Sequence, residues 1–287
     1  MSNLKWQTTP AIDAAPLDQA RQQLHSAAQL VAEVGRSLLP PDDEDAMANL
    51  GWSGLHDAMV GRTVAEDLAA GLEVATLSLI VLRGEQRLAT LSLDGHTMTD
   101  ARKWLHEQLA QAGVAVANLT KQRPYELPAY PPLQGAPFQL ADPRAFDTLR
   151  MYYANADLTL RSLCEPEPNA SAVRIWPHHF DVASLITVTQ AQNGQYIGLG
   201  MSPGDGTGGY EQPYFYVNLW PKPDPAQLNL PQFELGGHWH TEGWVGAVLL
   251  HETLTSTLSY DQQERMVQQF MAQAVQINRL TLSSQAG

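Results

Sequence analysis

The sequence predicts an α+β fold, in which antiparallel sheets carry helices on one face and two related lobes are joined by a Pro-rich strap. The first observation is composition, because 287 residues with 44% hydrophobic and 16% charged residues are typical of a globular protein. The second is periodicity, since some segments show apolar residues at helical spacing and others alternate as strands do. The third is order: each half of the chain runs helix, strands, helix, although no residue-level repeat relates the halves.

Residues 1–15 contain prolines and no apolar periodicity, so we expect a tail or a segment that wraps an edge. From 16 to 38 apolar residues recur at steps of three and four, which predicts an amphipathic helix that Pro40 ends. The acidic residues in 40–45 indicate a solvated connection. In 52–64 the period is ambiguous.

A hairpin is predicted next, because the apolar run in 72–82 and the alternating stretch 88–93 flank Arg-Gly-Glu-Gln. The Asp-Gly that follows turns the chain into a predicted helix over 98–112, with Gly113 as its stop. Residues 16–117 therefore form the predicted N-terminal α+β lobe.

Residues 118–142 hold many prolines and little regular pattern, so we expect an extended strap across the surface. Residues 143–287 form the predicted C-terminal α+β lobe, which opens with a helix over 143–164, because Asp-Pro is a good helix start. A final helix is predicted over 260–279. Five strands lie between these helices, at about 172–175, 182–189, 196–201, 214–219 and 239–251, the last with a break at its glycines.

Charge and cysteine content exclude several partners. A formal net charge of −13 argues against binding to nucleic acid or to an anionic membrane surface, because both need clustered Lys and Arg. The single cysteine, Cys164, cannot form an internal disulfide, and we expect it to be a buried thiol in a soluble, cytoplasmic protein. The oligomeric state stays open.

The densest histidine pattern is a His-Trp-His-Thr-Glu run that begins at His238. In a strand, the period of two would send His238, His240 and Glu242 to one face, which is a metal-ligand arrangement. The same parity in the preceding His-His-Phe-Asp segment puts His179 together with Asp181. If the two strands face each other, His179, His238 and His240 would form a three-histidine metal set.

Three interpretations of these histidines stay open: metal ligands, hydrogen-bonding groups that shape a polar pocket, or structural residues. In the metal interpretation Asp181 or Glu242 would be a fourth ligand, a hydrogen-bond partner of a ligand, or a general base. Imidazole and carboxylate suit both zinc and iron, so the metal is not identified. We expect the three rings to converge, with His178 packed against Phe180.

The glycine-rich segment 204–209 does not indicate a P-loop, because it lacks the required lysine and no helix pattern follows it. Its glycines predict a connection with positive φ angles. We expect this connection to border the pocket, in which case Asp205 would act as a lid residue.

The second half is also rich in aromatic residues. Aromatic residues in strands are more often core than ligand platform, but a pocket lined with rings is the functional alternative. The residues concerned are Tyr214, Phe215, Tyr216, Trp176, Trp220, Trp239 and Trp244.

The order of motifs resembles that of an uncharacterised, mainly bacterial domain-of-unknown-function family. The resemblance covers most of the chain from about residue 50 onward and implies a shared fold and a shared pocket, but no activity. The residues that carry it are Trp52 to His56, the hairpin and helix over 74–113, Trp176 to Ala183 with its Trp-Pro-His-His-Phe-Asp motif, Gly198 to Gly206, and Glu211 to Tyr216 with Glu-Gln-Pro-Tyr-Phe-Tyr.

Two functional hypotheses follow. The first is a metal-dependent enzyme, hydrolytic or oxygen-using, with the three histidines as ligands. The second is a metal-free pocket, lined by aromatic and histidine side chains, that binds a small cationic or aromatic molecule. The acidic balance and the aromatic residues favour cation–π contacts in the second case. A purely structural or interaction module is a third interpretation.

Overall fold

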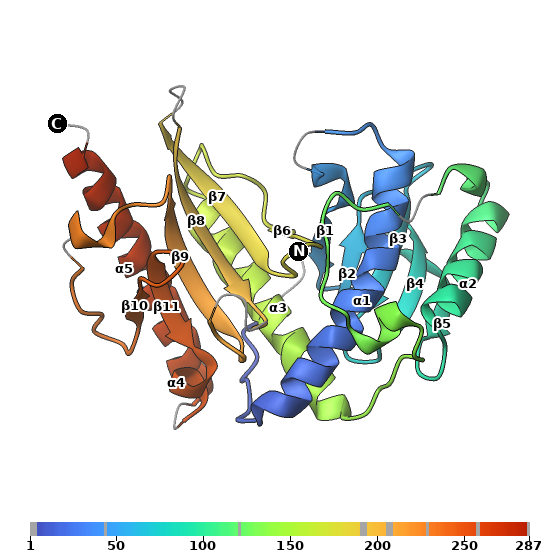
Figure 1. The fold of residues 1–287 in the computed structure, drawn as a ribbon, viewed down its shortest axis with the longest axis horizontal. Coiled ribbons are helices and arrows are strands. Elements are labelled where there is room, and N and C mark those ends of the chain that lie inside the picture. The colour runs from blue at the N-terminus through green and yellow to red at the C-terminus, as the bar shows by residue number, and fades with distance from the viewer. Residues whose placement is uncertain are drawn as a thin grey trace. The chain divides into compact units, whose positions relative to one another are not determined.

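The computed structural model describes residues 5–42, 45–119, 122–189, 194–204, 209–227, 230–256 and 259–285. The chain divides into two compact units, both visible in Figure 1. Unit 1 consists of Ala15–Arg150 and Arg174–Phe180, and unit 2 joins residues 5–14 to Met151–Val173 and to the residues from Asp181 onward. The predicted lobes, 16–117 and 143–287, each lie mostly within one unit, and the Pro-rich strap belongs to unit 1.

Unit 1 contains a sheet of antiparallel neighbours in the order β6-β1-β2-β3-β4-β5. Helix α2 packs on β4 and β5. The division between the units falls within α3, after Arg150. The elements are α1 (Ala14–Leu38), β1 (Leu50–Ser53), β2 (Ala58–Gly61), β3 (Leu68–Glu73), β4 (Ser78–Arg83), β5 (Gln86–Ser92), α2 (Met98–Gln111), the first turns of α3 (Pro143–Cys164) and β6 (Arg174–Ile175).

Unit 2 contains antiparallel strands in the order β10-β11-β9-β8-β7. Its elements are the rest of α3, β7 (Val182–Thr189), β8 (Gln195–Ser202), β9 (Tyr214–Trp220), β10 (His238–His240), β11 (Gly246–Leu250), α4 (His251–Thr255) and α5 (Tyr260–Gln285). The α+β class with antiparallel strands is therefore confirmed. Among the described residues, no helix is both long and apolar enough to cross a membrane.

Local signals explain the helices that the sequence predicted well. Thr97 caps α2, because its side chain accepts a hydrogen bond from the Asp100 amide while Asp100 accepts from the Thr97 amide. Gly113, with φ of 96°, follows the helix and permits the left-handed turn that ends it. Pro143 opens α3 without leaving an unpaired amide.

The strand predictions need two corrections. The apolar run in 72–82 is not one strand, because the chain turns at Leu77, with φ of 47°, and divides the run between β3 and β4. The stretch 239–251 has the break that was predicted at its glycines, because β10 and β11 are separated by a turn at Gly243 with φ of 79°. The correction here concerns its end: the strand stops at Leu250, and His251 already begins α4.

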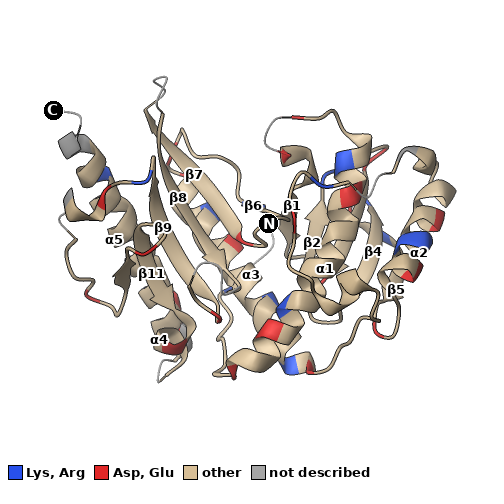
Figure 2. Ribbon diagram, in the orientation of Figure 1, with Lys and Arg blue, Asp and Glu red and all other residues tan. Residues whose placement is uncertain are grey.

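The sheet of unit 2 has two different faces. One face carries large apolar side chains, such as Phe215 and Val217 of β9, and α5 packs on β8 and β9. We call it the helix face. The other face carries Tyr216 and Asn218 of β9, which are paired with Gly200 and Gly198 of β8. We call it the open face. Most charged residues lie on helices and connections, and the strands are largely uncharged (Figure 2).

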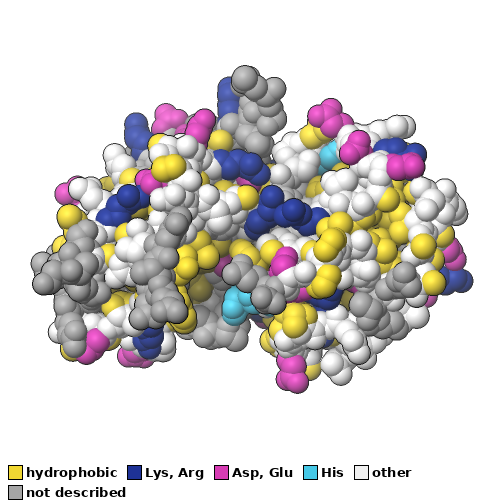
Figure 3. Space-filling model, turned by 90° about the horizontal axis from the view of Figure 1, so that it is seen from above, with side chains coloured by type: hydrophobic (Ala, Val, Ile, Leu, Met, Phe, Trp, Pro, Cys, Tyr) yellow, Lys and Arg dark blue, Asp and Glu magenta, His cyan; other side chains and the backbone are white. Residues whose placement is uncertain are grey.

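In the space-filling view, acidic and basic side chains are both present on the face shown, with hydrophobic side chains between them (Figure 3). This mixture is ordinary for a globular surface. Although the net charge is −13, the acidic side chains do not form one continuous patch on the face that Figure 3 shows.

Candidate functional site

The first part of the site is the histidine pair on β10. His238 and His240 are two residues apart on a strand, so they share the open face, as the sequence predicted. Both rings reach the hydroxyl of Tyr210, at 2.8 Å from His238 Nε2 and 3.1 Å from His240 Nδ1. A tyrosine hydroxyl therefore bridges the two imidazoles.

The direction of this hydrogen-bond chain follows from one carbonyl group. His240 Nε2 lies 2.5 Å from the backbone oxygen of Glu242, and a carbonyl only accepts, so Nε2 carries a hydrogen. In the neutral ring Nδ1 is then an acceptor, and the Tyr210 hydroxyl donates to it. The Tyr210 oxygen in turn accepts from His238 Nε2. Both ring nitrogens of His240 are thus engaged by protein atoms.

Glu242 does not join the histidines in the way that the sequence predicted. Glu242 would share the face of the histidines only if the strand continued that far, but β10 ends at His240. The side chain of Glu242 is exposed, and its contribution is the backbone carbonyl that binds His240. The predicted carboxylate of the pair is therefore replaced by a main-chain acceptor.

Aromatic rings surround the histidine pair. Trp244 stacks on His240, with ring centroids 4.5 Å apart and an interplanar angle of 25°. Tyr214, Tyr216 and Trp244 form a triangle with centroid distances of 6.1, 6.3 and 6.4 Å. Tyr210 closes this group, because its ring lies 4.9 Å from that of Tyr214. We call these four aromatic residues and the two histidines the ring cluster.

Asp181 adds a carboxylate to the ring cluster. The Tyr216 hydroxyl donates to Asp181 Oδ2 at 2.5 Å, and so the tyrosine crosses β8 from β9 to the start of β7. Gly200 makes this crossing possible, because a Cβ at that position would lie 2.6 Å from the Tyr216 hydroxyl oxygen. Asp181 was predicted as a site residue, but its hydrogen bond with Tyr216 was not predicted.

Two other glycines have the same effect on the open face. A Cβ at Gly198 would lie 2.2 Å from Asn218 Oδ1, and one at Gly246 would lie 2.5 Å from the Trp244 ring. Both distances are too short for a real side chain. These glycines therefore form a floor across which neighbouring side chains lie.

The protonation states at the site follow from burial and from neighbouring charge. Burial raises the pKa of Tyr216 well above its ordinary value, and the adjacent Asp181 raises it further. Desolvation also raises the pKa of Tyr210. Partial desolvation of its ring lowers the pKa of His238, and the neighbouring His240 adds to this effect. At neutral pH both phenols and His238 are uncharged.

His179 lies in the other unit. It belongs to unit 1, whereas His238 and His240 belong to unit 2. Among the described residues, no group of three or more His, Cys, Asp or Glu side chains is placed to hold a metal ion. The three-histidine metal set, with zinc or iron as its ion, stays a prediction.

The packing predicted for His178 is different in the structure. His178 contacts the rings of Trp176, His179 and Tyr125, at centroid distances of 5.8, 4.3 and 5.5 Å. Phe180 instead stacks on His25, at 4.8 Å and 5°. The reason is local: the chain turns here, and Phe180 has a φ of 60°, so strand parity does not hold. Burial, with a smaller contribution from His179, lowers the pKa of His178 to about 4.

The glycine-rich connection meets the site at its described end. Gly209 has φ of 91°, as expected, and a Cβ there would lie 3.4 Å from the His240 ring. Asp205, the predicted lid residue, lies outside the described residues. Tyr210 follows Gly209 directly, and its role was not predicted, because a residue in a connection shows no periodicity that would mark its direction.

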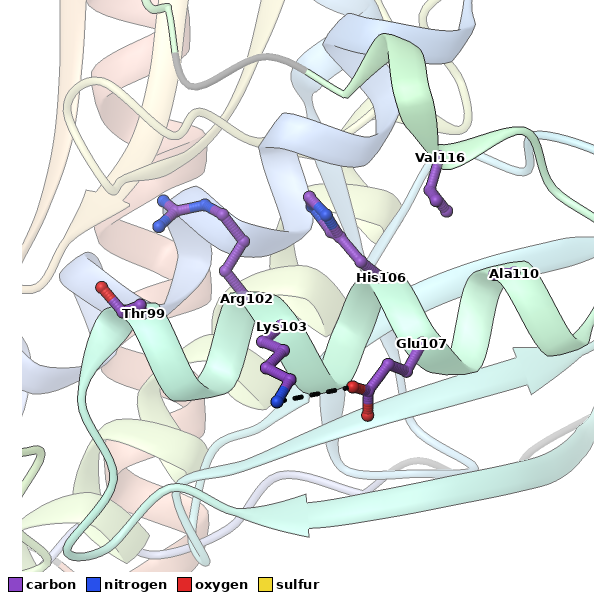
Figure 4. A pocket seen from close by; sticks show the side chains of 7 residues that line it. All are labelled: Thr99, Arg102, Lys103, His106, Glu107, Ala110 and Val116. Atoms are coloured by element: carbon purple, nitrogen blue, oxygen red, sulfur yellow. Dashed lines mark ion pairs between the residues drawn. The ribbon is translucent and has the colours of Figure 1, made fainter.

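A pocket of about 470 Å³ lies along α2 in unit 1 (Figure 4). Arg102 and His106 point to the same side of the helix, and both face Glu33 of α1, at 3.0 and 3.4 Å. Lys103 pairs with Glu107 at 3.9 Å. These ionisable groups compensate one another, so the ring cluster is the stronger candidate for a binding site.

A scan against protein-family models found no match, and neither did searches of curated proteins and of solved structures. The resemblance to a family of unknown function therefore stays a prediction. The ring cluster and the Asp181 carboxylate beside it are the features of this chain that point to a function.

Proposed function

We propose that unit 2 is a metal-free binding module for a small organic cation, which lies on the ring cluster. The observation that carries the proposal is the triangle of Tyr214, Tyr216 and Trp244, whose centroids are 6.1 to 6.4 Å apart, beside the carboxylate of Asp181. A cation within about 6 Å of a ring centroid is attracted by the negative face of the ring. One cation can satisfy this distance for all three rings.

The charges at the site favour a cation over a neutral aromatic ligand. Asp181 accepts a hydrogen bond from Tyr216, and a phenol that donates to a carboxylate gains electron density in its ring. The uncharged state of His238 adds no positive charge. The ammonium group of Lys222 binds the Gly243 carbonyl at 2.6 Å. That lysine is therefore directed to the backbone beside Trp244.

The histidines act as supports in this proposal. The chain from His238 through Tyr210 to His240 fixes the Tyr210 ring, and the stack on His240 fixes Trp244. Ligation of a metal by His240 would require one of its two hydrogen bonds to break. This geometry favours the binding hypothesis over the metal-dependent enzyme.

The test compares a quaternary ammonium probe with its neutral isostere. Choline and 3,3-dimethylbutan-1-ol have nearly the same shape and differ in charge. Calorimetric titration should show binding of choline only, and Trp244→Leu should weaken it by roughly 10-fold, as the loss of a cation–π contact predicts. Trp220→Leu is the matched control, because this tryptophan is 62% exposed and lies on β9, the strand that holds Tyr214 and Tyr216, but outside the ring cluster.

Two results would contradict the proposal. Equal binding of the neutral isostere would show an apolar site without charge recognition. Binding that appears only after zinc or iron is added, and that is lost in a His238→Ala/His240→Ala variant, would favour the metal hypothesis. Elemental analysis of untagged protein completes this comparison.

A further inference from the structure

The N-terminal segment, defined here as residues 5–13, has no helix or strand of its own, yet unit 2 binds its backbone. Asn155 of α3 accepts from the Gln7 amide at 2.8 Å and donates to the Gln7 carbonyl at 2.7 Å. Gln263 of α5 does the same for Thr9, with both bonds 3.0 Å long. Two side-chain amides thus imitate two bridges of a β-ladder.

An indole anchors the segment. Trp6 is 2% exposed, and its ring stacks on Phe215 on the helix face, with centroids 6.5 Å apart and planes at 28°. Thr9 is also 2% exposed, and its hydroxyl donates to Gln263 Oε1 at 3.1 Å. The segment therefore buries one large side chain and one small polar one.

The groups beneath the segment are polar and buried. Asn155 and Gln263 are each 1% exposed, so water cannot replace the hydrogen bonds that their amides make with the segment. Tyr152 and His251 form a buried pair, with 2.5 Å between the Tyr152 oxygen and His251 Nδ1. Thr9 slightly lowers the pKa of Tyr152 and the backbone of Ile12 slightly raises that of His251, so the segment lies next to this pair. Without an occupant, several buried polar groups would lose their partners.

We propose that α3, α4 and α5 of unit 2 form a slot for an extended peptide, which the N-terminal segment fills here and which the same segment of a second copy can also fill. The slot binds mainly the peptide backbone, at the positions of Gln7 and Thr9, which are two residues apart. It also requires an indole at the position of Trp6, directly before Gln7. It lies on the helix face, and the ring cluster lies on the open face of the same sheet. The slot is therefore independent of the proposed ligand site.

The direct test uses a labelled peptide with the sequence of residues 5–13. Full-length protein with Trp6→Ala has a weakened segment and an intact slot, so it should bind the peptide in a saturable way by fluorescence anisotropy. Wild-type protein should bind much more weakly, because its own segment competes at an effective concentration on the order of millimolar. A peptide with alanine in place of tryptophan should bind at least about 100-fold more weakly.

Matched variants separate the slot from general effects. Gln263→Ala, added to Trp6→Ala, should weaken peptide binding, whereas Gln269→Ala on the exposed side of α5 should not. If Trp6→Ala does not fold alone, Gln7→Pro is the second host, since it removes the amide hydrogen that Asn155 accepts and keeps the Trp6 side chain. Recovery of the folded state by the peptide would then support the slot.

A separate experiment tests whether the segment of one copy fills the slot of another. Trp6→Ala protein supplies an intact slot, and Asn155→Ala/Gln263→Ala protein supplies an intact segment. Mixed together, they should form a heterodimer in analytical ultracentrifugation, while each alone stays unchanged. Folded host proteins that bind no peptide would overturn the slot, and peptide binding without any heterodimer would overturn the exchange between copies.

Discussion

The buried pair Tyr152–His251 makes a quantitative prediction about pH. Burial lowers the pKa of His251 to about 4, with a smaller opposing contribution from the backbone of Ile12. An unfolded histidine titrates near pH 6.5. Below pH 6.5 the unfolded chain therefore binds more protons than the folded one, and the free energy of unfolding falls as the pH decreases.

The magnitude follows from the two pKa values. Between pH 8 and pH 5 the pair should lose about 2 kcal/mol of stability, and about 3 kcal/mol once the pH is below 4. The side chain is 2% exposed, so solvent screening does not reduce this value much. The loss from this group is only about 0.4 kcal/mol at pH 6.5 and is negligible above about pH 7.5.

His251→Asn isolates the effect. An asparagine oxygen can still accept from the Tyr152 hydroxyl, but it does not titrate. Urea unfolding of both proteins at pH 8, 6.5, 5.5 and 5 should show a steeper pH dependence for the wild type, by about 2 kcal/mol at pH 5. His178, also shifted, is common to both proteins and cancels. Parallel curves for the two proteins would refute the reasoning.

Three further substitutions test the packing described above. Gly200→Ala places a Cβ 2.6 Å from the Tyr216 hydroxyl oxygen, so it should lower stability by roughly 1–3 kcal/mol and weaken choline binding; an unchanged melting temperature and affinity would contradict the glycine floor. Gly35→Ala, which would ordinarily favour a helix, should instead destabilise α1, because its Cβ would lie 2.2 Å from the Met47 carbonyl oxygen; thermal unfolding decides the sign. Thr97→Ala removes the cap of α2 and should lower the free energy of unfolding by about 1 kcal/mol, whereas Thr97→Ser should retain most of it in urea titrations.

Helices that carry their own start and stop signals could be predicted from the sequence. The prediction of a helix over 98–112 agrees with Met98–Gln111, because a cap and a glycine mark its two ends. The boundary between β3 and β4 depended instead on a turn at Leu77, a non-glycine residue with φ of 47° inside an apolar run, which no local pattern marked. Tertiary context decided that turn.

The candidate site was predicted only in part, for a related reason. Parity placed His238 and His240 on one face, since both lie within a strand, but it failed for Glu242, which lies beyond the strand end. The role of Tyr210 depends on a contact with residues about 30 positions later in the chain. Spacing alone contains no information about such a contact. The alternation of Gly198 and Gly200 opposite Asn218 and Tyr216 is a signal that could have indicated the glycine floor.

The binding of the N-terminal segment also affects when the protein can finish folding. Thr9 and Gln263 are separated by 254 positions, so this contact closes a loop that includes most of the chain. During synthesis on the ribosome the segment emerges long before α5, which holds Gln263. Unit 2 therefore cannot be completed until α5 has been made, and contacts between such distant residues generally slow folding.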